Sequence, residues 1–366
     1  MEGERKVKEE KTHDVPWQLV KLGHCPKKKQ VHAVLKLPSV QPRRYSGEWV
    51  RLPVRLVLHS NNGDAVHALT IMRDSTGSNI LQARLVTEGP SGLHAWVEPF
   101  CGNLEYYLRS SRLGIPGNRG PEDKFVLPSH NVRSAVGGLV DGMKQLILAG
   151  LYHGNLSLAN TYYTMDEKDP NTLEVKLCNF RKKPGTYKKK LAEDWKAIRA
   201  GLRQIRRIAD TLKQAYPNID CCQLDGLIDC MGRINSSNAE VAFEVIRKQP
   251  FFWGREEWKS FFIQDIPLAL TEPQFRIKVQ NANLIDLPWN RNIGFSNALA
   301  VMDAHRESKG KKAYDTKSPV AFVKCVSGLF THEALLKLGK RVDEIIEDHC
   351  PDIYYKLYVL LPRAKT

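Results

Sequence analysis

The sequence has no long apolar run, and this absence excludes one class of protein. No stretch of its 366 residues approaches the roughly 20 apolar residues that cross a bilayer. The first residues, MEGERKVKEEK, are charged and are followed by no apolar signal core. We therefore expect a cytoplasmic or nuclear protein without a membrane segment, not a secreted one.

Cysteines with metal-binding spacing are also missing. The eight cysteines include no C-x-x-C pair and form no Cys/His zinc pattern. The adjacent Cys221 and Cys222 are poorly placed to bond to each other, because disulfide geometry is demanding. We predict reduced thiols, as in cytosolic and nuclear proteins, and no metal site.

Positive charge is present in excess. Lys and Arg number 55 against 40 Asp and Glu, a net charge of +15. Residues 181–213 contain twelve Lys/Arg and three Asp/Glu, so a net +9 lies in one stretch. A dense basic stretch attracts phosphates or nucleic acid. The alternative is a solvated basic loop and helix face, which the charge alone favours.

The order of the predicted elements indicates an α+β fold. Hydrophobic residues make up 42% of the chain, enough for a packed core. Residues 1–45 are rich in Lys, Glu and Pro and predict a partly ordered arm. Residues 47–101 are rich in β-branched and aromatic residues and predict strands. Helices follow, with the strongest apolar periodicity at 129–151 and 194–216.

Four motifs in the first two thirds of the chain resemble those of a protein kinase. Trp96–Leu104 is similar to a kinase hinge. Tyr152–Asn160 stands where a kinase has its H-R-D-L-x-x-x-N catalytic loop. Cys178–Arg181 follows a short predicted strand, Leu173–Leu177, and resembles the D-F-G motif. Asp194, which we expect to open the basic helix, matches the Asp of the kinase F helix.

The segment after the kinase-like part narrows the resemblance. Lys248–Trp253 resembles the H-P-F-F-W that ends the kinase domain of the inositol-requiring kinase/endoribonucleases of the unfolded protein response and of ribonuclease L. In that family a helical ribonuclease domain, called KEN, follows immediately. The aromatic residues here are expected to join the two domains: Phe251, Phe252, Trp253, Trp258, Phe261 and Phe262.

The resemblance implies a two-lobed, kinase-like fold followed by an all-α KEN domain. The implied domains are an arm at 1–45, a pseudokinase domain at 46–249 and a KEN domain at 250–366. Within the pseudokinase domain, the N-lobe reaches about residue 97, the hinge covers 98–104 and the C-lobe covers 105–249.

The kinase-like part lacks the residues of phosphoryl transfer. By alignment, Val57 stands at the position of the third-strand Lys and Ala68 at that of the C-helix Glu. The catalytic Asp is replaced by Asn155, and the D-F-G Asp by Asn179, so Asn160 alone remains of the metal-binding pair. A neutral Asn is a poor magnesium ligand. We therefore predict a pseudokinase with no cofactor, neither ATP nor magnesium.

The KEN-like part keeps half of the expected nuclease residues. KEN domains cut RNA without metal, through attack of the 2′-hydroxyl on the adjacent phosphodiester. The family pattern of Tyr, Arg-Asn and His falls here on Tyr314, Ser327, Gly328 and His332. The resemblance implies that Tyr314 is the base and His332 the acid, while the Arg and the Asn are missing.

The missing Arg removes the main positive charge of the site. Losing one donor to a transition-state anion typically costs ~10²–10³ in rate. Lys324, one helical turn before Ser327, is one candidate replacement, and Lys317 is another. Neither supplies a bidentate guanidinium.

Three functions remain open from the sequence. One is a metal-independent endoribonuclease, weak or altered, that is active as a dimer. A second is a catalytically dead regulator that pairs with full-length relatives, or binds RNA through residues 181–213. A third is a pseudokinase scaffold in which the KEN domain is only structural. RNA is the expected partner, as is a homodimer or heterodimer formed through kinase-lobe and KEN surfaces.

Overall fold

A computed structural model describes most of the chain. It covers residues 18–25, 30–41, 44–59, 68–69, 71–72, 77–89, 92–114, 125–165, 173–285, 288–289, 293–336, 338, 340–350 and 352–361. Strands and helices occur together, which confirms the predicted α+β class.

The chain divides into two compact units, which we describe separately. Unit 1 comprises residues 1–111, 134–201 and 234–243. Unit 2 comprises residues 112–133, 202–233 and 244–366. This division does not coincide with the boundary expected at residues 249 and 250, because residues 202–233 cluster with the C-terminal helices.

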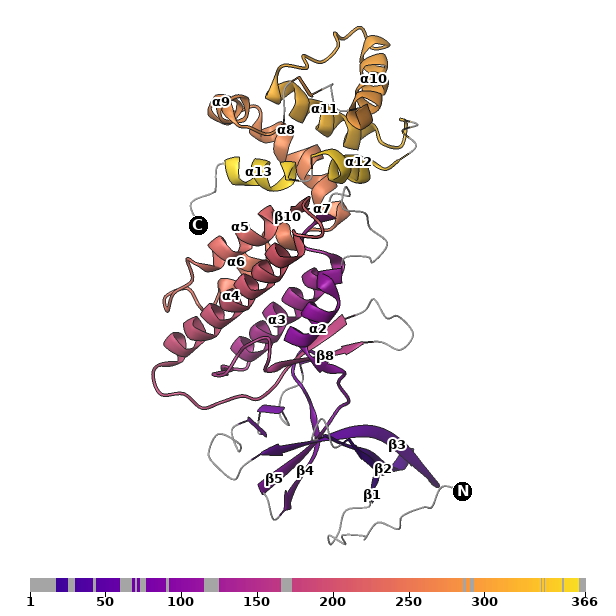
Figure 1. The fold of residues 1–366 in the computed structure, drawn as a ribbon, viewed down its shortest axis with the longest axis vertical. Helices are drawn as coiled ribbons and strands as arrows, with labels where there is room; N and C mark the ends of the chain where they lie inside the picture. Colours follow the sequence, from indigo (N-terminus) through magenta and orange to yellow (C-terminus); the bar gives the residue numbers. More distant parts are fainter. Residues whose placement is uncertain are drawn as a thin grey trace. The chain divides into compact units, whose positions relative to one another are not determined.

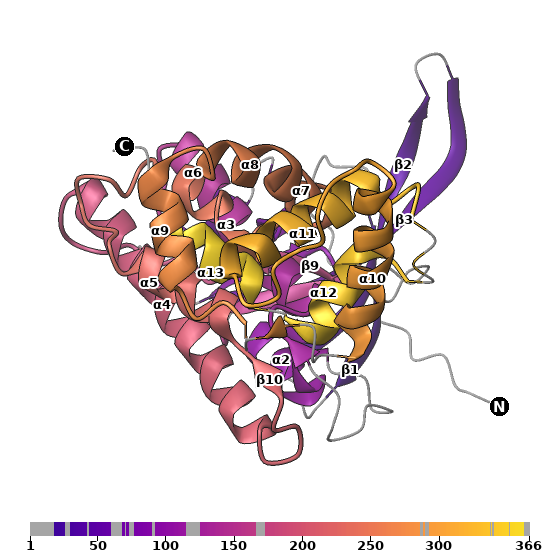
Figure 2. The same cartoon turned by 90° about the horizontal axis from the view of Figure 1, so that it is seen from above.

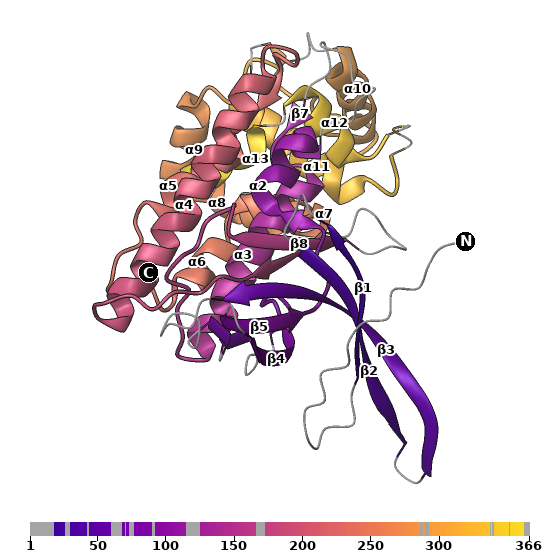
Figure 3. The same cartoon turned by 60° about the horizontal axis from the view of Figure 1, so that its bottom comes forward.

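Unit 1 contains a five-stranded antiparallel sheet (Figures 1 and 3). Its strands are β1 (Gln18–Cys25), β2 (Gln30–Gln41), β3 (Arg44–His59), β4 (Ala83–Gly89) and β5 (Gly92–Val97). The spatial order is β1-β2-β3-β5-β4. The middle strand β3 pairs with β2 and β5, and in the latter ladder Val57 lies opposite Ala95.

The first two strands correct the prediction of an arm at 1–45. Residues 18–25 and 30–41 are strands of the sheet, so that prediction is wrong for them. Part of the signal was present, since residues 31, 33, 35 and 37 are apolar, the period of a strand, although Val34 between them is apolar too. The frequent Lys and Pro residues around these positions obscured it. Residues 44 and 45 are the first residues of β3, and the other residues of the expected arm lie outside those described.

The helical part of unit 1 begins after the sheet. Its elements include β6 (Gly102–Asn103), α2 (Leu104–Ser110), β8 (Thr161–Met165), β9 (Leu173–Leu177) and the helices α3 (His130–Leu148) and α4 (Tyr187–Leu212), which continue into unit 2. Strands β6, β8 and β9 form a small sheet in that order. The predicted strand at 173–177 is confirmed.

Two glycines let α3 lie close to β9. A Cβ atom at Gly138 would lie 2.6 Å from Val175 Cβ, and one at Gly142 would lie 2.6 Å from Leu177 Cδ1. The two glycines are four residues apart and therefore share one helix face. Any larger side chain at either position would push the helix away from the strand.

Unit 2 is mostly helical. Its short first elements are the 3-10 turn η1 (Arg112–Gly114) and the paired strands β7 (Phe125–Val126) and β10 (Ile219–Asp220). Its helices are α5 (Cys222–Met231), α6 (Ala242–Arg247, which begins in unit 1), η2 (Pro250–Phe252), α7 (Arg255–Ser260), the π-helix η3 (Phe261–Asp265), α8 (Ile266–Ala269), α9 (Pro273–Asn281), α10 (Ile293–Glu307), α11 (Pro319–His332), α12 (Val342–His349) and α13 (Ile353–Leu360).

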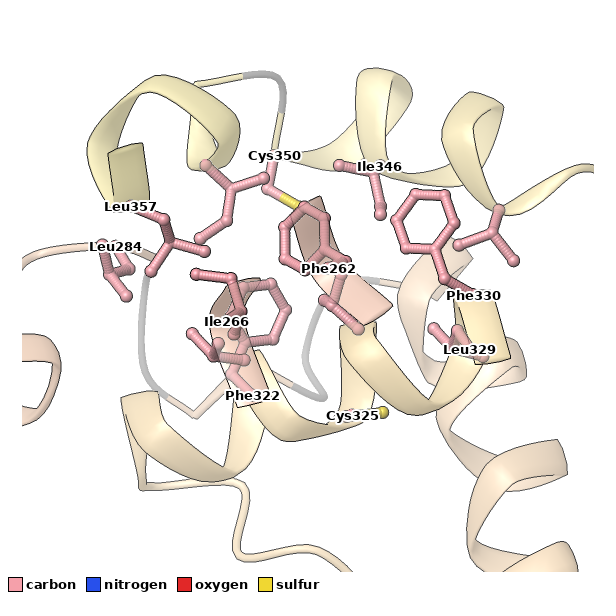
Figure 4. Packing of buried hydrophobic residues seen from close by; sticks show 14 of the residues in the cluster. Phe262, Ile266, Leu284, Phe322, Cys325, Leu329, Phe330, Ile346, Cys350 and Leu357 are labelled. Atoms are coloured by element: carbon pink, nitrogen blue, oxygen red, sulfur yellow. The ribbon is translucent and has the colours of Figure 1, made fainter. Parts of the chain in front are cut away.

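The core of unit 2 is built around α11 (Figure 4). Apolar residues recur along it at helical spacing, and Phe322, Val326, Leu329 and Phe330 are buried. Phe262 of η3 stacks on Phe330 with ring centroids 5.3 Å apart. Burying one such side chain contributes about 1.5–3 kcal/mol. The core therefore determines which face of α11 is buried and which face remains available for a functional site.

Helices α9, α10 and α12 surround the face of α11 that carries the candidate functional site. Helix α11 contacts α9 and α10, and α10 also contacts α12 (Figure 2). The aromatic segment at 250–262 belongs to the same unit, where η2 lies against α5 and α13. Among the helices that the structure describes, none combines the length and apolar content needed to cross a membrane.

Candidate functional site

The kinase-like loop of unit 1 is organised by a buried carboxylate. Asp194 accepts hydrogen bonds from the backbone N–H of His153 (2.7 Å) and of Gly154 (2.9 Å). Burial raises the pKa of Asp194 to about 6, although these hydrogen bonds oppose the rise. Gly154 has a left-handed φ of 74°, and a Cβ there would lie 2.1 Å from the carbonyl oxygen of Arg181. The loop therefore requires both residues.

Asp194 does not open its helix, which corrects the expectation. Helix α4 begins at Tyr187, and its first turn contains three consecutive lysines. Lysine is a good helix former, and no Pro or Gly interrupts the segment from 187 to 194. The carboxylate of Asp194 is consequently free of any capping role and binds the loop instead.

Three asparagines, at the positions that the kinase resemblance assigns to the catalytic residue and the metal ligands, are linked by hydrogen bonds within the loop. The Asn155 side-chain amide donates to the carbonyl of Asn179 (3.1 Å), and the Asn160 amide donates to the carbonyl of Asn155 (3.1 Å). Asn179 itself has a left-handed φ of 60°. These positions offer only neutral oxygens, whereas Mg²⁺ prefers carboxylates.

A buried lysine that the sequence did not reveal lies on β9, which precedes Cys178 and Asn179 in the chain. Lys176 of β9 places its Nζ 3.4 Å from Glu98, 3.2 Å from Glu174 and 2.7 Å from the carbonyl of Ser78. Glu98 also accepts from the backbone N–H of Gln82. The predicted hinge thus begins with a carboxylate that is already bound within unit 1.

In unit 2, Tyr314 lies against the end of α10. Its backbone N–H donates to Asp303 (3.0 Å), and its hydroxyl donates to the carbonyl of Lys324 (3.3 Å). The guanidinium of Arg306 stacks over its ring at 4.1 Å. Burial raises the pKa of Tyr314, and the nearby Arg306 offsets only part of that rise. The phenol is therefore protonated at neutral pH.

His332 occupies the last turn of α11. Its ring lies 4.6 Å from that of His305, measured between centroids. Burial lowers the pKa of His332, and the charges of His305, Lys311 and Lys309 lower it further. At neutral pH the imidazole is therefore uncharged and can accept a proton.

The fold brings Tyr314 and His332 to one side of α11. A Cβ atom at Gly328 would lie 3.3 Å from the Tyr314 hydroxyl. His332 follows Gly328 by four residues, so it lies one turn further along the same helix face. Two adjacent residues at the end of α10 contact this pair. His305 contacts His332, and Arg306 contacts Tyr314.

The positions of the missing Arg and Asn are filled differently. A Cβ atom at Gly328 would lie 2.7 Å from Cε of Met302, so the side chain of Met302 takes this space. Ser327 uses its carbonyl to accept from the Thr331 hydroxyl (2.8 Å). Of the two predicted replacement cations, Lys324 lines a groove beside Tyr314, whereas Lys317 is not among the residues that line it.

This groove has a volume of about 670 Å³ and lies between α9, residues 313–318 and the first turns of α11. Arg276, Arg306 and Lys324 line it, with Asp315 as the only carboxylate among the lining residues. Sequence reasoning missed Arg306 and His305. The signal that could have indicated them is the run of basic residues from 305 to 312, directly before Tyr314.

An ion-pair network secures the end of α11 next to His332. Glu333 pairs with Arg255 of α7 (2.8 Å) and accepts from the backbone N–H of Val342 (3.0 Å). Arg255 also contacts Asp343 of α12 (3.3 Å). Burial opposes ionisation of Glu333, but these partners outweigh it and lower its pKa. The backbone that carries His332 is thereby tied to two other helices.

Comparison with known proteins adds no identification. No protein-family model matches the chain, and no curated protein matches it either.

Among the described residues, no group of three or more His, Cys, Asp or Glu side chains could hold a metal ion.

Proposed function

We propose that the C-terminal helices form a KEN-type endoribonuclease that cleaves RNA without a metal ion, and that the kinase-like part transfers no phosphate. The observation that supports this most directly is the position of Tyr314 and His332 on one side of α11. Metal-free cleavage at a 2′-hydroxyl needs one group that accepts a proton and one that donates a proton. A neutral imidazole and a protonated phenol supply these two groups.

The pKa shifts favour roles opposite to those that the resemblance implies. His332 has a lowered pKa and is ready to accept a proton. Tyr314 has a raised pKa and keeps its proton to donate. We therefore assign His332 as the base and Tyr314 as the acid, because each is then in the correct protonation state at neutral pH.

The proposed reaction is balanced within the RNA and these two side chains. His332 takes the proton of the 2′-hydroxyl, and the 2′-oxygen attacks the adjacent phosphorus. The bond from phosphorus to the 5′-oxygen breaks, and that oxygen takes the proton of Tyr314. The products are a 2′,3′-cyclic phosphate and a 5′-hydroxyl, and proton exchange through water restores both side chains.

The test is RNA cleavage in EDTA by the full chain and by two histidine variants. We expect His332→Ala to lose ~10²–10⁴ in rate, the usual contribution of acid–base catalysis. His349→Ala, in the last turn of α12, removes an imidazole at an equivalent helix end and should leave the rate unchanged. Equal cleavage by the wild-type protein and His332→Ala would contradict the proposal.

A second function is favoured by Ser327 and Gly328, which replace the Arg and Asn of the family pattern. It is a catalytically dead regulator that binds RNA or pairs with full-length relatives. Two measurements together separate the two proposals. Sedimentation of the purified chain, alone and mixed with RNA, reports dimerisation and RNA binding, and the assay in EDTA reports cleavage. A protein that dimerises or binds RNA but leaves it intact in EDTA is the regulator, whereas cleavage whose specific rate rises with protein concentration indicates the dimeric enzyme.

A further inference from the structure

The groove beside Tyr314 has an unbalanced charge. Three cationic side chains line it, Arg276 from α9, Arg306 from α10 and Lys324 from α11, against the single carboxylate of Asp315. Within the described part of the chain, none of the three forms an ion pair. Three uncompensated cations around one concave surface create a positive potential that attracts anions.

Arg306 is held in place rather than solvated freely. Its Nε donates to the carbonyl of Lys312 (2.8 Å), and its guanidinium stacks on the Tyr314 ring at 4.1 Å. These contacts restrain a side chain that otherwise loses considerable rotamer entropy on binding. Arg306 also lines the groove, and its planar fork suits a phosphate oxygen pair.

Helix α10 both fills the space over Gly328 and supplies a cation to this surface. Met302 fills the space over Gly328, and Arg306 follows Met302 by one helical turn on α10. The cation that α11 lacks at Ser327 is thus supplied to this surface by α10. No sequence offset within α11 indicates this, because the donor lies before Tyr314 in the chain.

The other groove residues suit an extended polyanion. Ser318 caps α11 by accepting from the Ala321 N–H, so the positive end of a 14-residue helix joins the cations. Arg276 and Lys324 come from different helices, α9 and α11, and line the same groove as Arg306. The volume of about 670 Å³ is that of a small-molecule site and admits a short single-stranded segment, not the full width of a duplex.

We propose that this groove binds the phosphodiester backbone of single-stranded RNA, with Arg306 as its main phosphate ligand and Arg276 and Lys324 on either side. This inference rests on the proposed function for its choice of RNA, since the reacting phosphate must lie beside Tyr314 and His332. Arg306 thereby takes over the charge that the family places at position 327.

The experiment measures binding to a fluorescein-labelled single-stranded deoxyoligonucleotide, which has the backbone but no 2′-hydroxyl and so cannot be cleaved. We expect Arg306→Ala to raise Kd roughly tenfold or more, since a hydrogen bond to a charged group is lost. The slope of log Kd against log salt should fall by about 1. Arg306→Lys should recover part of the affinity, because it restores the charge but not the fork.

Control variants separate this groove from the general positive charge of the protein. Arg276→Ala should weaken binding, whereas Lys278→Ala, also on α9 and exposed but outside the groove, should not. Circular dichroism confirms that each variant is folded. Equal Kd values for the wild-type protein, Arg306→Ala and Arg276→Ala would overturn the inference, as would full displacement of the strand by polyglutamate at matched charge.

The two proposals fail in different ways. If the strand binds in a manner that depends on Arg306 but RNA is not cleaved in EDTA, the nuclease is refuted and the groove stands. If RNA is cleaved in a manner that depends on His332 while Arg306→Ala binds and cleaves normally, the nuclease stands and the groove is refuted.

Discussion

The kinase-like loop of unit 1 and the groove of unit 2 use their polar groups in opposite ways. In the loop, Asn155 and Asn160 bind backbone carbonyls and Asp194 binds backbone N–H groups. In the groove, Arg276 and Lys324 form no ion pair with any described residue. The polar groups of the loop stabilise its backbone, whereas the cations of the groove remain available to bind an anionic ligand.

This difference teaches that polar residues in a motif-like loop can serve its shape alone. Asn155 and Asn179, where the kinase resemblance expects Asp, offer no anionic ligand, while the side-chain amides of Asn155 and Asn160 hydrogen-bond to backbone carbonyls of the loop. Helix α11 likewise has Ser327 and Gly328 where the family pattern expects Arg and Asn, yet the groove beside it contains ionisable side chains. Polar groups that satisfy one another stabilise, whereas binding and catalysis need groups that are left available.

After the loss expected for His332→Ala, the largest expected effect concerns the phenol of Tyr314 in the groove. Tyr314→Phe removes the proposed acid and should lower cleavage ~10²–10³-fold. Against pH, kcat/KM should rise through a pKa below 6.5, the usual value for His, and fall above 10.0, the usual value for Tyr. The variant should lose the alkaline limb. Tyr216→Phe, a half-buried phenol outside the groove, is the control, and an unchanged profile in Tyr314→Phe would exclude the role.

The next effect concerns the stability of the loop. Asp194→Ala leaves two buried backbone N–H groups without an acceptor, which should cost about 2–4 kcal/mol of unfolding free energy. Urea denaturation measures it. Asp229→Ala, an exposed carboxylate on α5, should change stability by less than about 0.5 kcal/mol. A loss at Asp194 no larger than that of the control would show that the loop does not depend on this carboxylate.

A smaller effect is the pH dependence that Asp194 imposes. Its pKa is about 6 in the folded chain against 3.8 for an unperturbed Asp. The folded state therefore holds the proton more tightly, and stability from this group is present below pH 3.8 and lost as pH rises through about 6. Asp194→Asn should flatten the stability curve in that window, and a curve that keeps its slope would assign the titration to another group.

The smallest expected effect is that of ATP with Mg²⁺ on thermal unfolding. Binding to the native state raises the apparent stability. Since Asn155 and Asn179 offer no carboxylate, we expect no measurable shift at sub-millimolar nucleotide. Asn179→Asp is the informative variant, because it restores one anionic ligand. A large stabilisation of the wild-type chain would show that the neutral site still binds nucleotide.

Much of the helical structure could be predicted from local pattern. The periodicity at 129–151 predicts α3, which spans His130–Leu148, and Ser129 accepts from the Val132 N–H as an N-cap. Strand β9 matches its prediction at both ends. Strands β1 and β2 were missed, because a strand gains its stability from pairing with neighbours that are distant along the chain. Their lysines and prolines weighed against them locally.

The candidate site shows the same division between local pattern and contacts that are distant along the chain. Tyr314 and His332 follow from offsets along one chain segment, and the structure brings them to one side of α11. Lys176 beside Glu98, and Arg306 on Tyr314, are contacts between different elements. Nothing in their local sequence specifies the partner.

The sequence by itself determined the absence of carboxylates at positions 155 and 179 and the surplus of positive charge, since residue identity decides both. It also determined the position of α3, because hydrogen bonds and apolar periodicity within a helix are local. Only the tertiary structure decided that α10 supplies a guanidinium to the groove and that burial, together with a neighbouring imidazole, lowers the pKa of His332. Charge interactions depend on distance in space, and packing sets that distance.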